Sequence, residues 1–170
     1  TWMSESFGPQ IITDYWDYRA THGYISVMNS WETILGTYGL SLADGWAKFT
    51  AWNYGTGYRA VAGVGYGEAA RYPYANFVGD TSSYPYSISG SVEHLAANQI
   101  RLLGFDGVTD GTLEVDFNGT AGGPMTISAF VEKQDGTGAI EVGTLGSDND
   151  GHFVFSTPLE QIKYVGLVVG

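Results

Sequence analysis

The stretch Leu113-Glu114-Val115-Asp116-Phe117-Asn118-Gly119 alternates apolar and acidic residues and then ends on an Asn-Gly pair. Alternation with a period of two places one side of a strand in a core and the other in water. An Asn-Gly pair favours a tight hairpin turn, because both residues tolerate a positive φ. This stretch therefore predicts an amphipathic strand in an antiparallel sheet.

The same pattern recurs through residues 92–170, where Asp-Gly and Asn-Gly turns separate short alternating runs about ten residues apart. The candidate strands are Gln99–Leu103, Thr112–Phe117, Met125–Glu132, Ala139–Leu145, His152–Ser156 and Lys163–Val169. Short strands with regular polar turns are typical of an antiparallel β-sandwich of the jelly-roll or immunoglobulin-like kind. We therefore expect residues 92–170 to form such a sandwich.

Helical spacing replaces this alternation in residues 1–56. Apolar residues between Phe7 and Trp16 recur about every four positions, and His22-Gly23 provides a helix stop. A second helix is expected over Val27–Leu35, and Ser41 opens a third as the N-cap of a Ser-x-x-Asp box. The third helix is expected to turn these side chains inward: Leu42, Trp46, Phe49, Trp52 and Asn53. Trp2, Trp16 and Trp31 also fall where a small helical bundle buries side chains. A helical bundle followed by strands predicts an α+β fold.

Residues 57–91 lack either period and are rich in glycine, tyrosine and proline. A stretch of this length without clear elements is either functional or a connector laid over the surface. Tyrosine suits a wrapped connector, since its ring packs while its hydroxyl stays wet. The tyrosines of this region that are candidates for binding or assembly are Tyr66, Tyr72, Tyr74, Tyr84 and Tyr86.

The composition indicates a protein that works outside the cell. Only 15% of the 170 residues are charged, and 18 acidic against 7 basic residues give a net charge of −11. This charge disfavours binding to nucleic acids and to anionic membranes. The chain has no cysteine, so disulfides and thiolate chemistry are excluded. No apolar run approaches the ~20 residues that cross a bilayer, and we expect no membrane insertion. The first and last residues resemble the interior of a longer chain, so we expect a piece of a larger secreted protein.

Several runs in the first part of the chain resemble one family, the bacterial secreted zinc metallopeptidases. These runs are Phe7–Ile12 followed by Trp16, then Leu40–Ala43, Phe49–Gly57 with its Trp-Asn-Tyr-x-Thr-Gly order, Arg59, and Glu68–Pro73. The resemblance covers roughly the first 75 residues, and beyond them only the layout, helices followed by a β-sandwich, is similar. It implies a zincin-like parent protein in which this chain forms the C-terminal region.

The metal site that the resemblance implies is not in this sequence. Zincins hold zinc with His-Glu-x-x-His, and that motif does not occur here, so any zinc site would lie upstream of Thr1. The histidines, His22, His94 and His152, share no ligand spacing and are expected to be ordinary surface residues. Asp148 and Asp150 resemble the start of a calcium loop, but a strand-like run follows at once, which favours a hairpin turn. Calcium between loops is left open as the weaker alternative.

No catalytic set emerges from the remaining residues. Pairs such as Glu114 with Asp116 fit solvated strand faces better than glycoside hydrolysis, and no Gly-x-Ser-x-Gly elbow is present. We therefore expect a non-catalytic scaffold or accessory region of a secreted metallopeptidase-like protein. Its partner would be the upstream domain of the same polypeptide or a neighbouring subunit. One alternative is a structural subunit of an extracellular filament or surface layer, and a further one is a carbohydrate-binding module.

Overall fold

A computed structural model describes residues 1–93, 95–120 and 123–170 of the chain. Four α-helices and seven strands are found in these residues, with the helices first. The helices are α1 (Trp2–Phe7), α2 (Gln10–His22), α3 (Val27–Thr37) and α4 (Leu42–Tyr54). The strands are β1 (Gly79–Thr81), β2 (Asn98–Leu102), β3 (Glu114–Phe117), β4 (Ile127–Lys133), β5 (Gly138–Gly143), β6 (Gly151–Val154) and β7 (Ile162–Val169). The expected α+β class is confirmed.

The helix boundaries follow the local signals in the sequence. Gly8-Pro9 separates α1 from α2, because Gly8 adopts a positive φ of 82° and proline begins the next helix. The hydroxyl of Ser41 accepts the Asp44 N–H, as expected for the N-cap of α4, and Ser26 caps α3 in the same way through Asn29.

The strands form two sheets rather than one continuous antiparallel array. The larger sheet has the order β1-β2-β7-β4-β5, and β3 pairs only with β6. All neighbours are antiparallel except β1 and β2, which run parallel, so the larger sheet is mixed, although every pair within residues 92–170 is antiparallel as expected. The cause is β1, an edge strand in the stretch expected to be a connector without elements.

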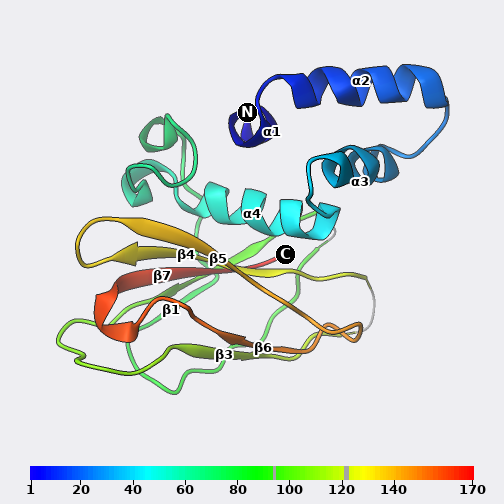
Figure 1. Cartoon of the computed structure of the whole chain (residues 1–170). Coiled ribbons are helices and arrows are strands. Elements are labelled where there is room, and N and C mark those ends of the chain that lie inside the picture. Colours follow the sequence, from blue (N-terminus) through cyan, green and yellow to red (C-terminus); the bar gives the residue numbers. More distant parts are fainter. Residues whose placement is uncertain (94, 121–122) are drawn as a thin grey trace.

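The two sheets and the helices form layers, with α4 against one face of the larger sheet and β3–β6 facing the other (Figure 1). Alternation along β7 serves both layers. Val165, Leu167 and Val169 join the core shared with β3–β6, whereas Val168 packs with Tyr54 of α4. Helices α1, α2 and α3 pack on one another and on α4, away from the sheet (Figure 1).

The burial of the helical side chains differs from the expected pattern at two places. The fully buried face of α4 consists of small residues and one tyrosine, among them Ala47, Ala51 and Tyr54, because the helix lies close to the sheet. The larger side chains of α4, Trp46, Phe49 and Trp52, are only half-buried. Trp16 was expected in a core but is 64% exposed, since no element covers that side of α2 in the described chain.

Candidate functional site

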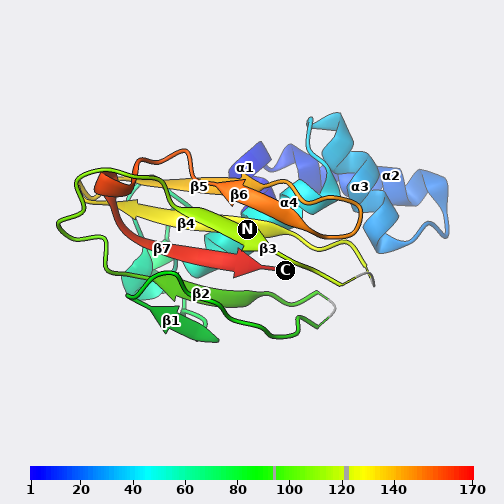
Figure 2. The ribbon, with the colours of Figure 1, turned by 90° about the horizontal axis from the view of Figure 1, so that it is seen from below.

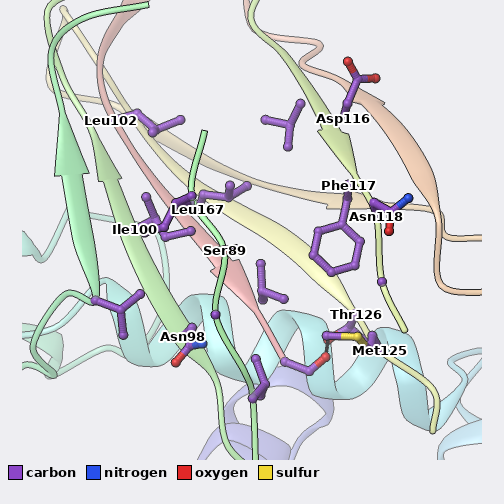
Figure 3. Close-up of a pocket in the computed structure, with 18 of the residues that line it drawn as sticks. Ser89, Asn98, Ile100, Leu102, Asp116, Phe117, Asn118, Met125, Thr126 and Leu167 are labelled. Atoms are coloured by element: carbon purple, nitrogen blue, oxygen red, sulfur yellow. Dashed lines mark hydrogen bonds between the residues drawn. The ribbon is translucent and has the colours of Figure 1, made fainter. Parts of the chain in front are cut away.

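A cleft of about 1770 Å³ lies between the larger sheet and β3, at the edge of β3 that faces away from β6 (Figure 3). It forms because β3 and β6 lie over the side of the large sheet that contains β4 and β5, and β2 extends beyond them (Figure 2). The floor is apolar and nearly buried: it contains Ile100 and Leu102 of β2 and Leu167 and Val169 of β7. We take this cleft, called the groove below, as the candidate site.

The first wall of the groove is β3. Its side chains alternate, so that Val115 and Phe117 are half-buried against the core while Glu114 and Asp116 are exposed. One edge of β3 pairs with β6 through Glu114↔Val154 to Phe117↔Gly151. The other edge has no strand beside it among the described residues and borders the groove.

The second wall is the extended segment Tyr84–Glu93, which is fastened by side chains rather than by a strand ladder. The Tyr84 hydroxyl donates to the Leu103 carbonyl at 2.8 Å, and burial raises the pKa of Tyr84 to about 12. The Asn98 amide donates to the Ser91 carbonyl at 2.9 Å, and Val92 packs on the core. Within the described chain, no backbone hydrogen bond joins residues 84–92 to another backbone group.

The rim of the groove is acidic. Four carboxylates belong to its lining, those of Glu32, Glu93, Glu114 and Asp116, and the described lining residues include no lysine or arginine. His152 of β6 lies beside the rim, with its Nδ1 2.7 Å from an Asp116 oxygen. That hydrogen bond, assisted by the charges of Asp116 and Glu114, raises the pKa of the His152 imidazole.

The five candidate tyrosines do not gather at one site. Tyr84 and Tyr86 line the groove, where they are 43% and 41% exposed. Tyr66 is buried among the helices, donates to Asn53 Oδ1 at 2.7 Å and packs edge-on against Tyr72; burial raises its pKa to about 12. Tyr74 is half-exposed in a third place, beside Arg59. Only Tyr84 and Tyr86 therefore belong to the candidate site.

Arg59 forms a second polar cluster, which is closed rather than open to a ligand. Its guanidinium lies 4.0 Å above the Phe77 ring and near the rings of Tyr54, Tyr74 and Tyr58, at 4.8, 5.1 and 5.3 Å. It donates to the Ala75 carbonyl at 2.7 Å, to the Gln99 side chain at 3.2 Å and to the Tyr58 hydroxyl at 3.3 Å. Because Arg59 is 2% exposed, this cluster serves the fold.

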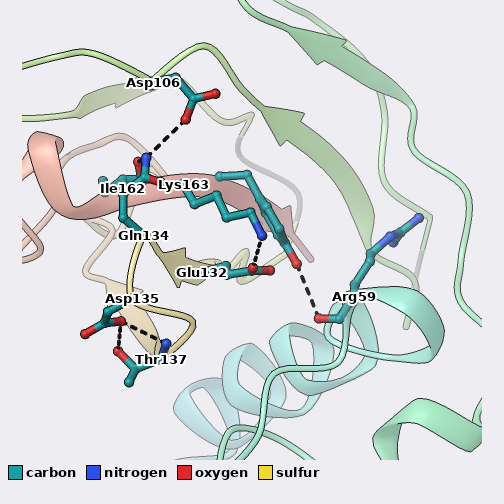
Figure 4. A network of polar contacts seen from close by, with 9 residues as sticks. Arg59, Asp106, Glu132, Gln134, Asp135, Thr137, Ile162 and Lys163 are labelled. Carbon is teal, nitrogen blue, oxygen red and sulfur yellow. Dashed lines mark hydrogen bonds and ion pairs between the residues drawn. The ribbon is translucent and has the colours of Figure 1, made fainter.

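A chain of polar contacts runs from Arg59 along β7 (Figure 4). The carbonyl of Arg59 accepts the Tyr164 hydroxyl at 3.4 Å, and Lys163 pairs with Glu132 at 2.6 Å. Burial and the neighbouring Glu132 carboxylate raise the pKa of the Tyr164 hydroxyl far above its ordinary value. These groups join η1 (Gly57–Arg59) to β4 and β7 and contribute no residue to the groove.

The acidic turn residues accept backbone N–H groups of their own loop and of the loop after β3. Asp150 accepts the Gly119 N–H at 3.0 Å, and Asp148 accepts the Asp150 N–H at 3.3 Å. Between them, Asn149 is buried with a φ of 66° and bonds across to the loop that precedes β4, through Met125, Thr120 and Gly123. Within the described residues no three His, Cys, Asp or Glu side chains are grouped to hold a metal, and His94 lies outside those residues.

No protein-family model matches this sequence, and no curated protein or solved structure is significantly similar to it. In the part of the chain that the structure describes, no helix is both long and apolar enough to cross a membrane.

The sequence placed the groove residues in strands but did not reveal the groove. Ile100, Val115 and Leu167 each lie at an apolar position of an alternating strand. That alternation is the same whether or not another strand covers the apolar face. The available signal was the absence of any strand-like run in residues 82–92, which left the second sheet with β3 and β6 alone among the described residues.

Proposed function

We propose that this chain is a non-catalytic accessory region of a secreted protein related to the zinc metallopeptidases it resembles, and that the groove is its binding site. One observation carries the proposal: an apolar cleft of about 1770 Å³ is bordered by β3 and Tyr84–Glu93, two segments with no strand of the described residues between them. A concave apolar site with a few polar groups at its rim is the usual form of a binding site. On this proposal the facing sheets are a sandwich, with the groove between its layers.

The chemistry of the remaining residues supports binding rather than catalysis. The rim carboxylates Glu114 and Asp116 are exposed. Exposed acidic side chains are common on strand faces that contact water, and they need no catalytic role. The low charge content supports an extracellular location. The zinc of the resembled enzymes would belong to another part of the parent protein, and calcium plays no part in the proposal.

A neutral apolar fluorescent dye, Nile red, tests whether the groove accepts an apolar ligand. We expect saturable binding, and we expect Ile88→Ser to weaken it about threefold, since Ile88 is a 41% exposed apolar residue of the groove wall. The matched control is Val154→Ser, which removes a 48% exposed apolar side chain outside the groove. Equal losses in the two variants, or no saturation, would count against the groove as a binding site.

The non-catalytic part of the proposal has its own test. The chain should show no hydrolysis of peptide substrates when zinc is added, because it lacks a His-Glu-x-x-His motif. Zinc-dependent hydrolysis that is abolished by a chelator and restored by zinc would overturn this part, whatever the dye shows.

Assembly is a second candidate function, and the exposed side of α2 favours it. Trp16 is 64% exposed and Ile12, one turn before it, is 37% exposed. Apolar side chains that share a helix face and lie open to solvent suit contact with an upstream domain or another subunit. Sedimentation velocity over a range of concentrations would detect self-association, and Trp16→Ser should abolish it. A monomer at every concentration would exclude self-assembly, and the exposed face of α2 would then be assigned to contact with another part of the same polypeptide.

A further inference from the structure

The groove has the form of a β-sandwich layer with one strand missing. On one side β3 has an unpaired edge, and on the other side Tyr84–Val92 makes no backbone hydrogen bond to another backbone group among the described residues. Side by side, an unpaired strand edge and an extended segment leave room for a strand between them. Figure 3 shows the segment with Ser89 passing over Ile100 and Leu167 of the floor, with Phe117 of β3 apart from it.

The register of β3 identifies the backbone groups that are free. Phe155 donates its N–H to the Leu113 carbonyl at 3.0 Å, so Leu113 and Phe155 form a hydrogen-bonded pair. Hydrogen-bonded and non-hydrogen-bonded pairs alternate along an antiparallel ladder. Val115 and Phe117 therefore bond toward β6, whereas the N–H and C=O groups of Glu114 and Asp116 point toward the groove.

The charges of the groove restrict what binds there. Glu32, Glu93, Glu114 and Asp116 lie in its lining, with no lysine or arginine among the described lining residues. A second copy of this chain, with a net charge of −11, would meet like charge at this rim. A segment with lysine or arginine beside its apolar residues would be attracted instead.

We infer that the groove binds an extended segment of another polypeptide, which adds a strand to the free edge of β3, turns alternate apolar side chains toward the floor and places basic residues against the rim. This inference rests on the proposed function and specifies its partner. Recognition of this kind draws affinity from main-chain hydrogen bonds and selectivity from the pockets that alternate side chains fill. Ile100 and Leu167 of the floor and Val115 of the wall would contact those side chains.

Three synthetic peptides test the inference on the unmodified chain. The first alternates valine and threonine and has two lysines at each end; the second replaces the lysines with glutamates. The third keeps the lysines but carries N-methyl groups on the amides of alternate residues, which removes the donors of one strand edge and leaves the side chains intact. Isothermal titration calorimetry should show binding of the first peptide, with each of the other two weaker by about tenfold.

Two variants of the protein test the edge of β3. Asp116→Pro removes the N–H that points toward the groove, and proline is tolerated at the open edge of a strand. Asp116→Ala is the matched control, because it loses the same carboxylate and keeps the N–H. The lysine peptide should bind Asp116→Pro about fivefold more weakly than Asp116→Ala, which corresponds to the loss of one backbone hydrogen bond. If Asp116→Pro does not fold, the N-methylated peptide on the unmodified chain decides the question.

Each outcome assigns the failure to one proposal. Binding that does not distinguish lysine from glutamate ends, or that tolerates N-methylation, would overturn strand addition. If Nile red still bound saturably, the groove would remain a binding site and only strand addition would be overturned. If the dye also failed to bind, both the binding site and strand addition would be overturned. A concentration-dependent dimer that Asp116→Pro dissociates and Asp116→Ala retains would assign the edge to a second copy of this chain and overturn a basic partner.

Discussion

Arg59 brings a positive charge into the interior without a carboxylate to balance it. In the described residues no acidic side chain lies within ion-pair distance of its guanidinium. Burial of a charge is costly unless hydrogen bonds and other favourable charges replace water. Here three acceptors and the faces of four aromatic rings replace it, and Phe77 is the nearest of those rings.

Arg59→Lys should destabilise the chain by about 3 kcal/mol despite keeping the charge. A lysine ammonium is a compact charge and does not reach the Tyr58 hydroxyl, Gln99 and Ala75 together as the planar guanidinium does. The side chain of Gln99, which is 5% exposed, would then be left unpaired in a buried site. Urea unfolding followed by circular dichroism measures the change. Arg71→Lys is the control, since the Arg71 side chain is 79% exposed, and a loss of equal size there would contradict the argument.

Sequence reasoning did not identify this residue as buried. Arg59 lies in a stretch without periodicity, where arginine is ordinarily a surface residue. Its burial depends on Phe77 and Gln99, which are distant in the chain and reach it only through the packing of β1 and β2. The cap of α4 could be predicted, because Ser41 and Asp44 lie one turn apart and their contact needs no tertiary structure.

At the scale of elements, α4 and the large sheet approach closely because each presents a glycine to an aromatic ring of the other. The Tyr54 ring of α4 lies on Gly166 of β7, and the Phe130 ring of β4 lies on Gly55 at the end of α4. A Cβ at either glycine would overlap the facing ring. The two contacts fix where α4 sits on the sheet.

Gly166→Ala should cost about 3 kcal/mol of unfolding free energy, because the new methyl group forces the Tyr54 ring out of a close-packed layer. Gly36→Ala is the matched control in α3, where a Cβ meets nothing within 4 Å. That substitution should stabilise the chain by up to about 1 kcal/mol, since alanine is the better helix former. Chemical denaturation of both variants checks the difference in sign, and destabilisation by both would refute it.

The two-stranded sheet carries a histidine whose pKa is raised by its neighbours. His152 of β6 faces Asp116 and Glu114 of β3, and its pKa is raised by the Asp116 hydrogen bond. A raised pKa in the folded state means that the imidazolium stabilises the β3–β6 pair fully below the unfolded pKa of about 6.5. This contribution is lost as pH rises through the folded pKa.

An NMR titration of the His152 ring should therefore give a midpoint above about 6.5. Asp116→Asn should move the midpoint back toward that value, because the largest cause of the shift is removed. Glu114→Gln should have the smaller effect, since its oxygen lies 3.7 Å from the ring rather than 2.7 Å. If neither substitution changed the pH midpoint of the His152 titration, the cross-strand contact would not form in solution.

The elements that sequence predicted are those with a strong local period. All six expected strands are present, within a few residues of β2 to β7, because alternation and Asp-Gly turns specify each of them locally. The third expected helix matches α4. Strand β1 was missed, since Gly79–Thr81 has no alternation and exists only by pairing with β2. The groove was not predicted either, because strand pairing is set by tertiary structure and no local pattern indicates which strand lacks a neighbour.

At the scale of the whole molecule, tyrosine connects the layers. Tyr54 packs between α4 and the sheet, Tyr66 between α4 and the segment after it, and Tyr164 between β7 and η1. In each place the ring fills an apolar interface and the phenol is removed from water. Burial raises the pKa of both Tyr54 and Tyr66 to about 12.

The fold should therefore be lost in alkali as its buried tyrosines ionise. A raised folded pKa means that the stabilising contribution is complete below the ordinary value near 10 and is lost as pH rises toward about 12. A rise in tyrosinate absorbance should coincide with loss of the far-ultraviolet circular dichroism signal. Tyr66→Phe should lower stability at neutral pH, because Asn53 loses its partner, and should flatten the alkaline dependence. A rise in tyrosinate absorbance without unfolding would show that these rings are open to solvent.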